Sequence, residues 1–155
     1  MEANIRDIYA RACDNCSDPA GRRVFEMLRD DEQYHFDYLT KRLAEMEQKG
    51  DIQLEPMHSA IPDPEQLQNQ LEKLKKTVAQ EDRGVLQQML SNALRAEVQT
   101  SEYYKKMTSE FTGKMHEMFA RFLEIEDAHV EAVQAELDYV MRTGYWFDFK
   151  EFDME

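Results

Sequence analysis

Two long segments of this chain, residues 22–49 and 114–143, contain no glycine or proline and carry apolar side chains at helical spacing. The apolar stripe of the first comprises Phe25, Leu28, Leu39, Leu43 and Met46, and that of the second comprises Met118, Phe122, Val133 and Val140. Each stripe is interrupted by a Glu-x-x-His motif, Glu32 to His35 in the first and Glu126 to His129 in the second. An ionised carboxylate in an apolar stripe costs several kcal/mol unless it is compensated, and a metal ion compensates a carboxylate and an imidazole together. Each motif therefore predicts half of a metal site.

The scarcity of helix breakers predicts a single all-α domain, because glycine and proline account for only 5 and 4 of the 155 residues. Two helices are expected over 1–49, a crossover linker with a short helix over 50–81, two more helices over 82–143 and an aromatic tail over 144–155. Breaks are expected near 16–19 and 111–113, where Asp18 before Pro19 is a typical N-cap with proline at the first helical position. We expect an up-down-up-down four-helix bundle with one long crossover, and a tail that packs on the bundle or on another subunit.

The net charge of −13, from 32 acidic and 19 basic residues, argues against nucleic acid as a partner, since an acidic surface repels phosphate. The sequence has no apolar run near the ~20 residues that a membrane span requires. It also lacks the basic, then apolar, N-terminus of a secretory signal. A cytoplasmic protein without membrane association is expected.

The two cysteines form a single Cys-x-x-Cys pair, Cys13 and Cys16, near the end of the first expected helix. One such pair is too few for a rubredoxin or zinc-ribbon site, which needs two. It is compatible with a redox dithiol, but two small buried residues are the favoured interpretation, because position 13 follows Tyr9 on the same helix face. The sequence leaves both interpretations open.

The two halves of the chain repeat one pattern beyond the Glu-x-x-His motifs. Glu2 is followed seven residues later by Tyr9, and Glu97 seven residues later by Tyr104, so each pair lies on one helix face. Glu2 precedes Glu32 by 30 residues, and Glu97 precedes Glu126 by 29. Glu97 is again a lone carboxylate among apolar positions, namely Leu86, Leu90, Ala93, Ser101, Tyr104 and Phe111. The candidate metal ligands are therefore Glu2, Glu32, His35, Glu97, Glu126 and His129, whereas His58 and His116 are expected at the surface.

Over residues 2–143, this arrangement resembles the ferritin-like di-iron and di-manganese carboxylate proteins, and is most similar to their rubrerythrin-like branch. The resemblance implies that Glu32 and Glu126 bridge two metal ions. It implies that Glu2 and His35 complete the coordination of one ion, and Glu97 and His129 that of the other. By the same resemblance, Tyr9 and Tyr104 hydrogen-bond the ligands and hold their orientation.

The resemblance implies a di-iron oxidoreductase that reduces hydrogen peroxide or dioxygen. Carboxylate-rich sites with one imidazole per metal suit iron or manganese better than structural zinc. Rubrerythrins of the usual kind carry a C-terminal rubredoxin domain; this chain ends in the aromatic tail, so the electron donor is expected to be a separate protein such as a rubredoxin. They also carry a further Glu three residues after the third-helix ligand, a position that is Thr100 here. Glu2 lies at the start of its helix, where helix ends fray, so a less rigid ligand is expected there.

Three alternatives keep the same ligands. An iron-storage protein with ferroxidase activity would form a closed shell, whereas a homodimer is expected for this chain. The length of the 50–64 linker is compatible with helices exchanged between subunits, and the sequence leaves this open. An oxygenase acting on a quinone or a modified base would require an apolar substrate channel. A bundle that binds metal only for stability would melt on metal removal and catalyse nothing.

Overall fold

Four long helices make up most of the chain in this computed structural model, which describes residues 1–61 and 83–143. They are α1 (Glu2–Asn15), α2 (Pro19–Lys49), α4 (Arg83–Glu110) and α5 (Gly113–Thr143). The described residues include no strand, so the all-α prediction is confirmed. None of the described helices is long and apolar enough to cross a membrane. The expected short helix near 64–80 and the aromatic tail lie outside the described residues.

The helix ends occur where the sequence provides capping residues. Asp18 accepts hydrogen bonds from the backbone N–H groups of Ala20 and Gly21 at 2.8 and 3.4 Å, and Pro19 opens α2. Gly50 ends α2 in the left-handed conformation, with φ 68°, where glycine has no steric penalty. These local signals explain why the predicted bounds match the observed ones closely.

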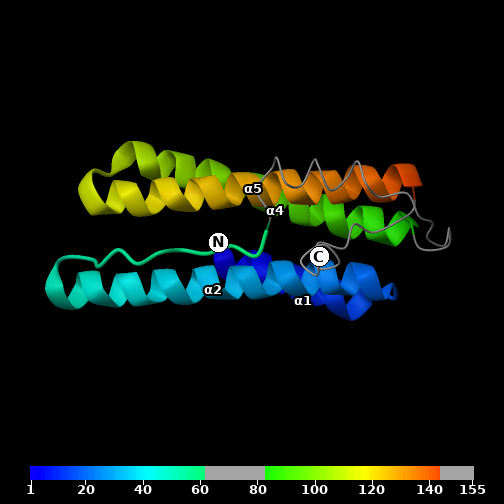
Figure 1. Cartoon of the computed structure of the whole chain (residues 1–155), viewed down its shortest axis with the longest axis horizontal. Coiled ribbons are helices and arrows are strands. Elements are labelled where there is room, and N and C mark those ends of the chain that lie inside the picture. The colour runs from blue at the N-terminus through cyan, green and yellow to red at the C-terminus, as the bar shows by residue number, and fades with distance from the viewer. Residues whose placement is uncertain (62–82, 144–155) are drawn as a thin grey trace, which may run out of the picture.

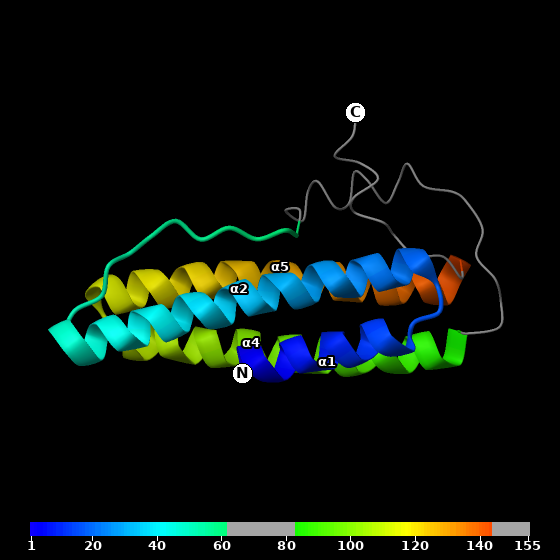
Figure 2. The ribbon, with the colours of Figure 1, turned by 90° about the horizontal axis from the view of Figure 1, so that it is seen from below.

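The four helices form a bundle in which α1 packs on α2, α4 on α5 and α1 on α4 (Figures 1 and 2). The helices α2 and α4 start from the same end of the bundle, so the chain runs up-down-down-up. The up-down-up-down prediction was therefore wrong. The segment 50–61 folds back along α2 and α5, away from the end at which α2 stops, and α4 begins at the opposite end.

The helix α1 covers only half of the bundle. Its 14 residues span about 21 Å, whereas the 31 residues of α2 span about 46 Å. Its first turn therefore lies near the middle of the bundle's length, and this is where the N-terminus is seen in Figure 1. This placement brings Glu2 level with the Glu-x-x-His motifs.

The predicted apolar stripes are observed with two corrections. Leu43 is 60 % exposed, and Arg42 is buried in its place, because positions 35, 38–39 and 42 follow the 3.6-residue period of α2. Phe111 is 40 % exposed, since it lies beyond the end of α4. Arg42 is compensated by Glu45 at 3.3 Å and Glu55 at 3.2 Å, and its guanidinium lies over the ring of Tyr38.

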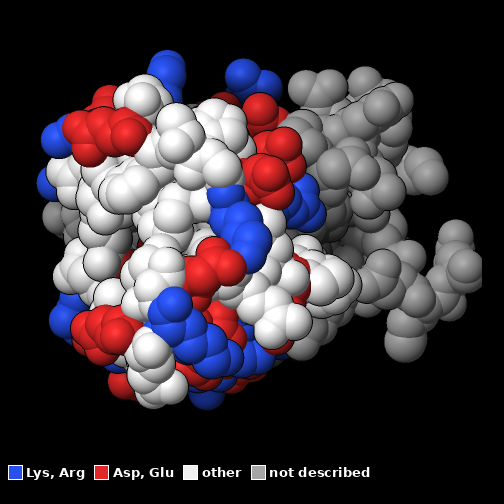
Figure 3. All heavy atoms as spheres, turned by 90° about the vertical axis from the view of Figure 1, so that its left-hand side faces the viewer, with Lys and Arg blue, Asp and Glu red and all other residues white. Residues whose placement is uncertain are grey.

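Acidic and basic side chains are interspersed at the end of the bundle where α2 stops and α5 begins (Figure 3). The ion pair of Lys41 with Glu55 at 2.7 Å and that of Lys114 with Asp51 at 2.5 Å belong to this region. Both pairs tie the segment after α2 to a neighbouring helix. The exposed pairs themselves contribute little to stability, since solvent screens them.

Candidate metal centre

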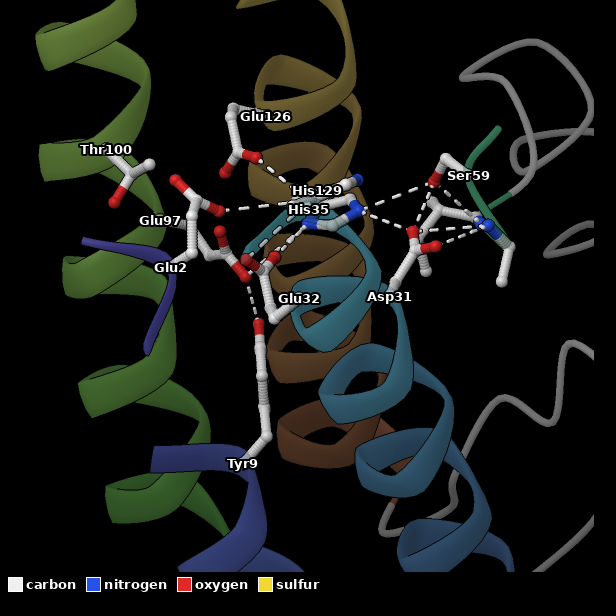
Figure 4. Close-up of polar contacts among 12 residues, drawn as sticks. Glu2, Tyr9, Asp31, Glu32, His35, Ser59, Glu97, Thr100, Glu126 and His129 are labelled. Atoms are coloured by element: carbon white, nitrogen blue, oxygen red, sulfur yellow. Dashed lines mark hydrogen bonds and ion pairs between the residues drawn. The ribbon is translucent and has the colours of Figure 1, made fainter. Parts of the chain in front are cut away.

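All six predicted ligands meet in the middle of the bundle (Figure 4). The four helices each contribute: Glu2 from α1, Glu32 and His35 from α2, Glu97 from α4, and Glu126 and His129 from α5. Glu2 is 3 % exposed and the other five are fully buried. Four carboxylates and two imidazoles thus share one pocket from which water is excluded.

The ligand atoms form two overlapping groups of four. Glu32 and Glu126 belong to both groups; Glu2 and His35 complete the first, and Glu97 and His129 the second. Within each group, all ligand atoms lie within 4.8 Å of one another. The Nδ1 atom of His129 lies 2.8 Å from Glu32, and that of His35 lies 3.5 Å from Glu126. The shared pair is thus placed where two carboxylates could bridge two cations.

The two tyrosines bind the lone glutamates of each other's helices. The hydroxyl of Tyr9 on α1 donates to Glu97 on α4, and that of Tyr104 on α4 donates to Glu2 on α1. Within one helix, Glu and Tyr seven residues apart are separated by about 10 Å along the axis, too far for contact. Because α1 and α4 run antiparallel, each tyrosine instead lies level with the glutamate of the other helix. Both contacts are buried and leave one oxygen of each glutamate directed at the centre.

Burial dominates the electrostatics of three of the carboxyl groups. It raises the pKa of Glu2 to about 8, with the nearby Glu126 and Glu32 adding to the effect. Burial likewise raises the pKa of Glu97, where His129 opposes it, and that of Glu126, where Glu32 adds to it. In the metal-free protein these groups therefore hold protons more strongly than ordinary carboxyl groups do.

Glu32 behaves in the opposite way. Burial would raise its pKa, but contacts with His129 and His35 outweigh burial and lower it. Burial also opposes protonation of His35, yet Glu126 and Glu32 raise its pKa to about 10. The neighbouring acids likewise raise the pKa of His129. Without metal, these shifts favour an anionic Glu32 in contact with two cationic imidazoles.

One residue of the site was missed by the sequence analysis. Asp31, 7 % exposed, lies on the far side of His129 and approaches its Nε2 atom at 3.0 Å (Figure 4). Asp31 accepts hydrogen bonds from the hydroxyl of Ser59 at 2.6 Å and from the backbone N–H of Ala60 at 3.1 Å. The matching position in the second motif is Ile125, so a comparison of the two repeats would have singled out Asp31.

The remaining sequence candidates lie away from the ligand cluster or take no part in it. Thr100 is buried beside the site, but its hydroxyl donates to the carbonyl of Ala96. His58 and His116 are exposed, as expected. Cys13 and Cys16 are both buried and not disulfide-bonded, and burial raises the pKa of the Cys13 thiol to about 11. Such a thiol is a poor nucleophile, which favours the interpretation of the pair as core residues.

The lack of hydrogen-bond partners for buried polar atoms of the six ligands indicates that these residues fit a dinuclear metal site. Nine of their buried side-chain nitrogen and oxygen atoms have no hydrogen-bond partner among the described residues: one each on Glu2, Glu97 and His129, and two each on Glu32, His35 and Glu126. Folded proteins pair nearly all such atoms, so a cluster of exceptions requires a cause. Two divalent cations would satisfy eight of these atoms, all but Nε2 of His35, and would balance four carboxylates. No protein-family model, curated protein or solved structure matches this chain.

Proposed function

We propose that the protein is a di-iron carboxylate oxidoreductase with a ferritin-like bundle, which reduces hydrogen peroxide or dioxygen in the manner of rubrerythrin-like proteins. The observation that carries the proposal is the buried cluster of six ligands, nine of whose polar atoms have no hydrogen-bond partner among the described residues. A structural role alone would favour apolar side chains here, because burying unpaired acids destabilises a fold. The cluster is therefore interpreted as a feature retained for metal.

The donor set favours iron, with manganese as the alternative. Four carboxylates and two imidazoles suit these metals, and the absence of thiolates from the cluster makes structural zinc a poor fit. Bound iron would supply two electrons together, so that hydrogen peroxide and two protons yield two molecules of water. A separate protein, such as a rubredoxin, would return the two electrons.

The protein residues hold the ligands in position and exclude water from the centre. Glu2 and Glu97 are held by the tyrosine hydroxyls, which leaves one oxygen of each free for a cation. The aromatic rings of Phe122 and Tyr104 stack at 4.9 Å, and Phe122 meets His35 edge-on at 5.5 Å. These rings exclude water from the side of the centre that holds His35. Glu2 and Glu97 give up their protons when they bind a cation, so the protons that reduction of peroxide consumes would come from solvent.

A second candidate function is favoured by one specific observation. An apolar pocket of about 290 Å³ is lined by Leu39, Leu43, Met118 and Phe119, among others, and reaches Tyr104. Tyr104 is the residue that binds Glu2, so the pocket lies one side chain from the proposed ligands. An oxygenase acting on an apolar substrate would need a cavity in this position. The variant Leu43→Trp, whose larger side chain would fill the pocket, tests this function. It should abolish oxidation of the apolar substrate and leave peroxide reduction intact.

Metal content tests the leading proposal first. Protein purified without added metal is expected to hold about two iron ions per chain, and the double variant Glu32→Ala/Glu126→Ala is expected to hold none. The matched control is Glu47→Ala/Glu131→Ala, which removes exposed glutamates from the same two helices and should retain the iron. Equal metal content in all three proteins would contradict the assignment of the ligands.

Peroxide kinetics then test the reaction itself. The reduced di-iron protein is expected to be oxidised by hydrogen peroxide far faster than free ferrous ion in stopped-flow experiments. A rate equal to that of free ferrous ion would refute the peroxidase proposal. Light scattering separates storage from catalysis, since a dimer excludes the closed shell that iron storage requires.

A further inference from the structure

The two histidines of the centre differ in what holds them. His129 directs Nδ1 at the ligand cluster, 2.8 Å from Glu32, and directs Nε2 at Asp31, 3.0 Å away. Asp31 is itself fixed by the hydroxyl of Ser59 and by the backbone N–H of Ala60. The ring of His129 is therefore locked in place by an anionic acceptor that the crossover segment anchors.

His35 has no counterpart to this arrangement. Its Nδ1 atom also faces the cluster, but in the described part of the chain its Nε2 atom has no hydrogen-bond partner. The position that corresponds to Asp31 is Ile125, 3 % exposed and packed in an apolar cluster with Phe122. Asp31 has an oxygen within 4.8 Å of a nitrogen of His35, yet among the described residues it hydrogen-bonds only His129 of the two.

The rest of the centre is matched between its two halves. Glu32 and Glu126 are shared by both ligand groups, and Glu2 and Glu97 each accept one tyrosine hydroxyl. Because these contacts are the same at both metal positions, they do not contribute to a difference in metal affinity between them. The exchange of Asp31 for Ile125 remains as the main difference between them.

We infer that the two metal positions are inequivalent, with the one formed by Glu97 and His129 binding a divalent cation at least ~10-fold more tightly than the one formed by Glu2 and His35. This inference rests on the proposed metal centre. An acceptor at Nε2 fixes the tautomer that leaves the Nδ1 lone pair free for metal, and it makes that lone pair a stronger donor. Loss of such an acceptor typically lowers metal affinity 10- to 100-fold. Asp31 is thus a positioning residue that makes the metal affinity of the His129 position higher than that of the His35 position.

Two single-site variants measure the difference without repulsion between two bound cations. Glu2→Ala disables the His35 position, and Glu97→Ala disables the His129 position; each variant loses one carboxylate and one tyrosine contact. Titration with Co²⁺, followed by its visible absorption, should give one tight site in Glu2→Ala. The site left in Glu97→Ala should be at least ~10-fold weaker. Equal affinities, or the reverse order, would overturn the inference.

Substitution of Asp31 assigns the cause. Asp31→Asn in the Glu2→Ala background should weaken Co²⁺ binding to the level of Glu97→Ala and should shift the Co²⁺ absorption bands. Asn has the size of Asp, so Asp31→Asn should fold like the wild-type protein even where a larger change, such as Asp31→Leu, does not. Unchanged affinity and an unchanged spectrum would show that Asp31 does not act through His129. Failure of the unmodified protein to bind Co²⁺ at all would instead refute the metal centre itself.

Discussion

Replacing Glu126 by leucine should stabilise the metal-free protein while removing its capacity to bind metal. Glu126 is fully buried, and neither of its carboxyl oxygens has a hydrogen-bond partner among the described residues. Burial, together with the neighbouring Glu32, raises its pKa. Without metal, this side chain is a buried acid that has lost its water, and the ion pair with His35 at 3.5 Å compensates this loss only in part.

The magnitude follows from that desolvation. An unsatisfied buried polar group costs about 1–3 kcal/mol, and apolar replacements of buried ionic groups are often stabilising by a similar amount. We expect Glu126→Leu to raise the free energy of unfolding of the metal-free protein by about 1–3 kcal/mol. For a chain of this size, this corresponds to a rise in Tm of roughly 2–4 °C per kcal/mol.

Urea unfolding followed by circular dichroism, in a chelator, measures the effect. The control Glu131→Leu makes the same change at an exposed position of α5 and should alter stability by no more than about 0.5 kcal/mol. With metal at about 1,000 times its Kd the order should reverse, because bound ligand then stabilises the wild-type protein by about 4.1 kcal/mol. A metal-free Glu126→Leu protein that is less stable than wild type would refute the reasoning, since it would show that the carboxyl group is satisfied without metal.

Three further predictions concern pH, orientation and capping. Burial raises the pKa of Glu2 to about 8, and carboxylate contacts that outweigh burial raise that of His35 to about 10. The protonated forms of both groups therefore stabilise the metal-free protein fully below the unfolded-state pKa values of about 4.5 and 6.5, and this stabilisation is lost as the pH rises through 8 and 10. The urea concentration at the midpoint of unfolding should therefore decrease as the pH is raised from about 5 to about 10. Metal-loaded protein should instead lose stability on acidification, because protons displace the metal. Tyr9→Phe should weaken Co²⁺ binding about 10-fold by freeing Glu97, as measured by competition with a chelating dye. Asp18→Ala should lower the free energy of unfolding by about 1 kcal/mol, whereas Asp18→Asn should preserve most of it, both measured in urea.

The helix bounds could be predicted because their signals are local. An N-cap aspartate followed by proline fixes the start of α2, and a glycine in the left-handed conformation ends it. The convergence of the six candidate ligands could be predicted because Glu32, Glu97 and Glu126 each interrupt an apolar stripe, and Glu2 repeats the spacing of Glu97 to its tyrosine. Burial of all four glutamates follows from the same periodicity that buries their apolar neighbours.

The direction of the second helix pair could not be predicted in the same way. A crossover of about 30 residues is long enough either to turn at one end of the bundle or to traverse it, so its length leaves both topologies open. Asp31 was missed for a related reason. It lies one residue off the apolar stripe of α2, and it is buried only because the segment 50–61 returns over that face and brings Ser59 and Ala60 to it.

The topology and the inequivalence of the two metal positions have one physical origin. Each half of the chain joins its two helices by a short turn, so neither half can cover its own histidine with a connecting segment. The segment 50–61 leaves the end of α2 and follows α2 and α5, where Ser59 and Ala60 meet Asp31 next to His129. Among the described residues, no segment supplies Nε2 of His35 with an equivalent partner, and an aspartate at position 125 would be buried in the apolar cluster around Phe122. Ile125→Asp should therefore destabilise the metal-free fold and fail to equalise the two affinities. A gain of affinity at the His35 position would show that the carboxylate alone, without an anchoring segment, is sufficient.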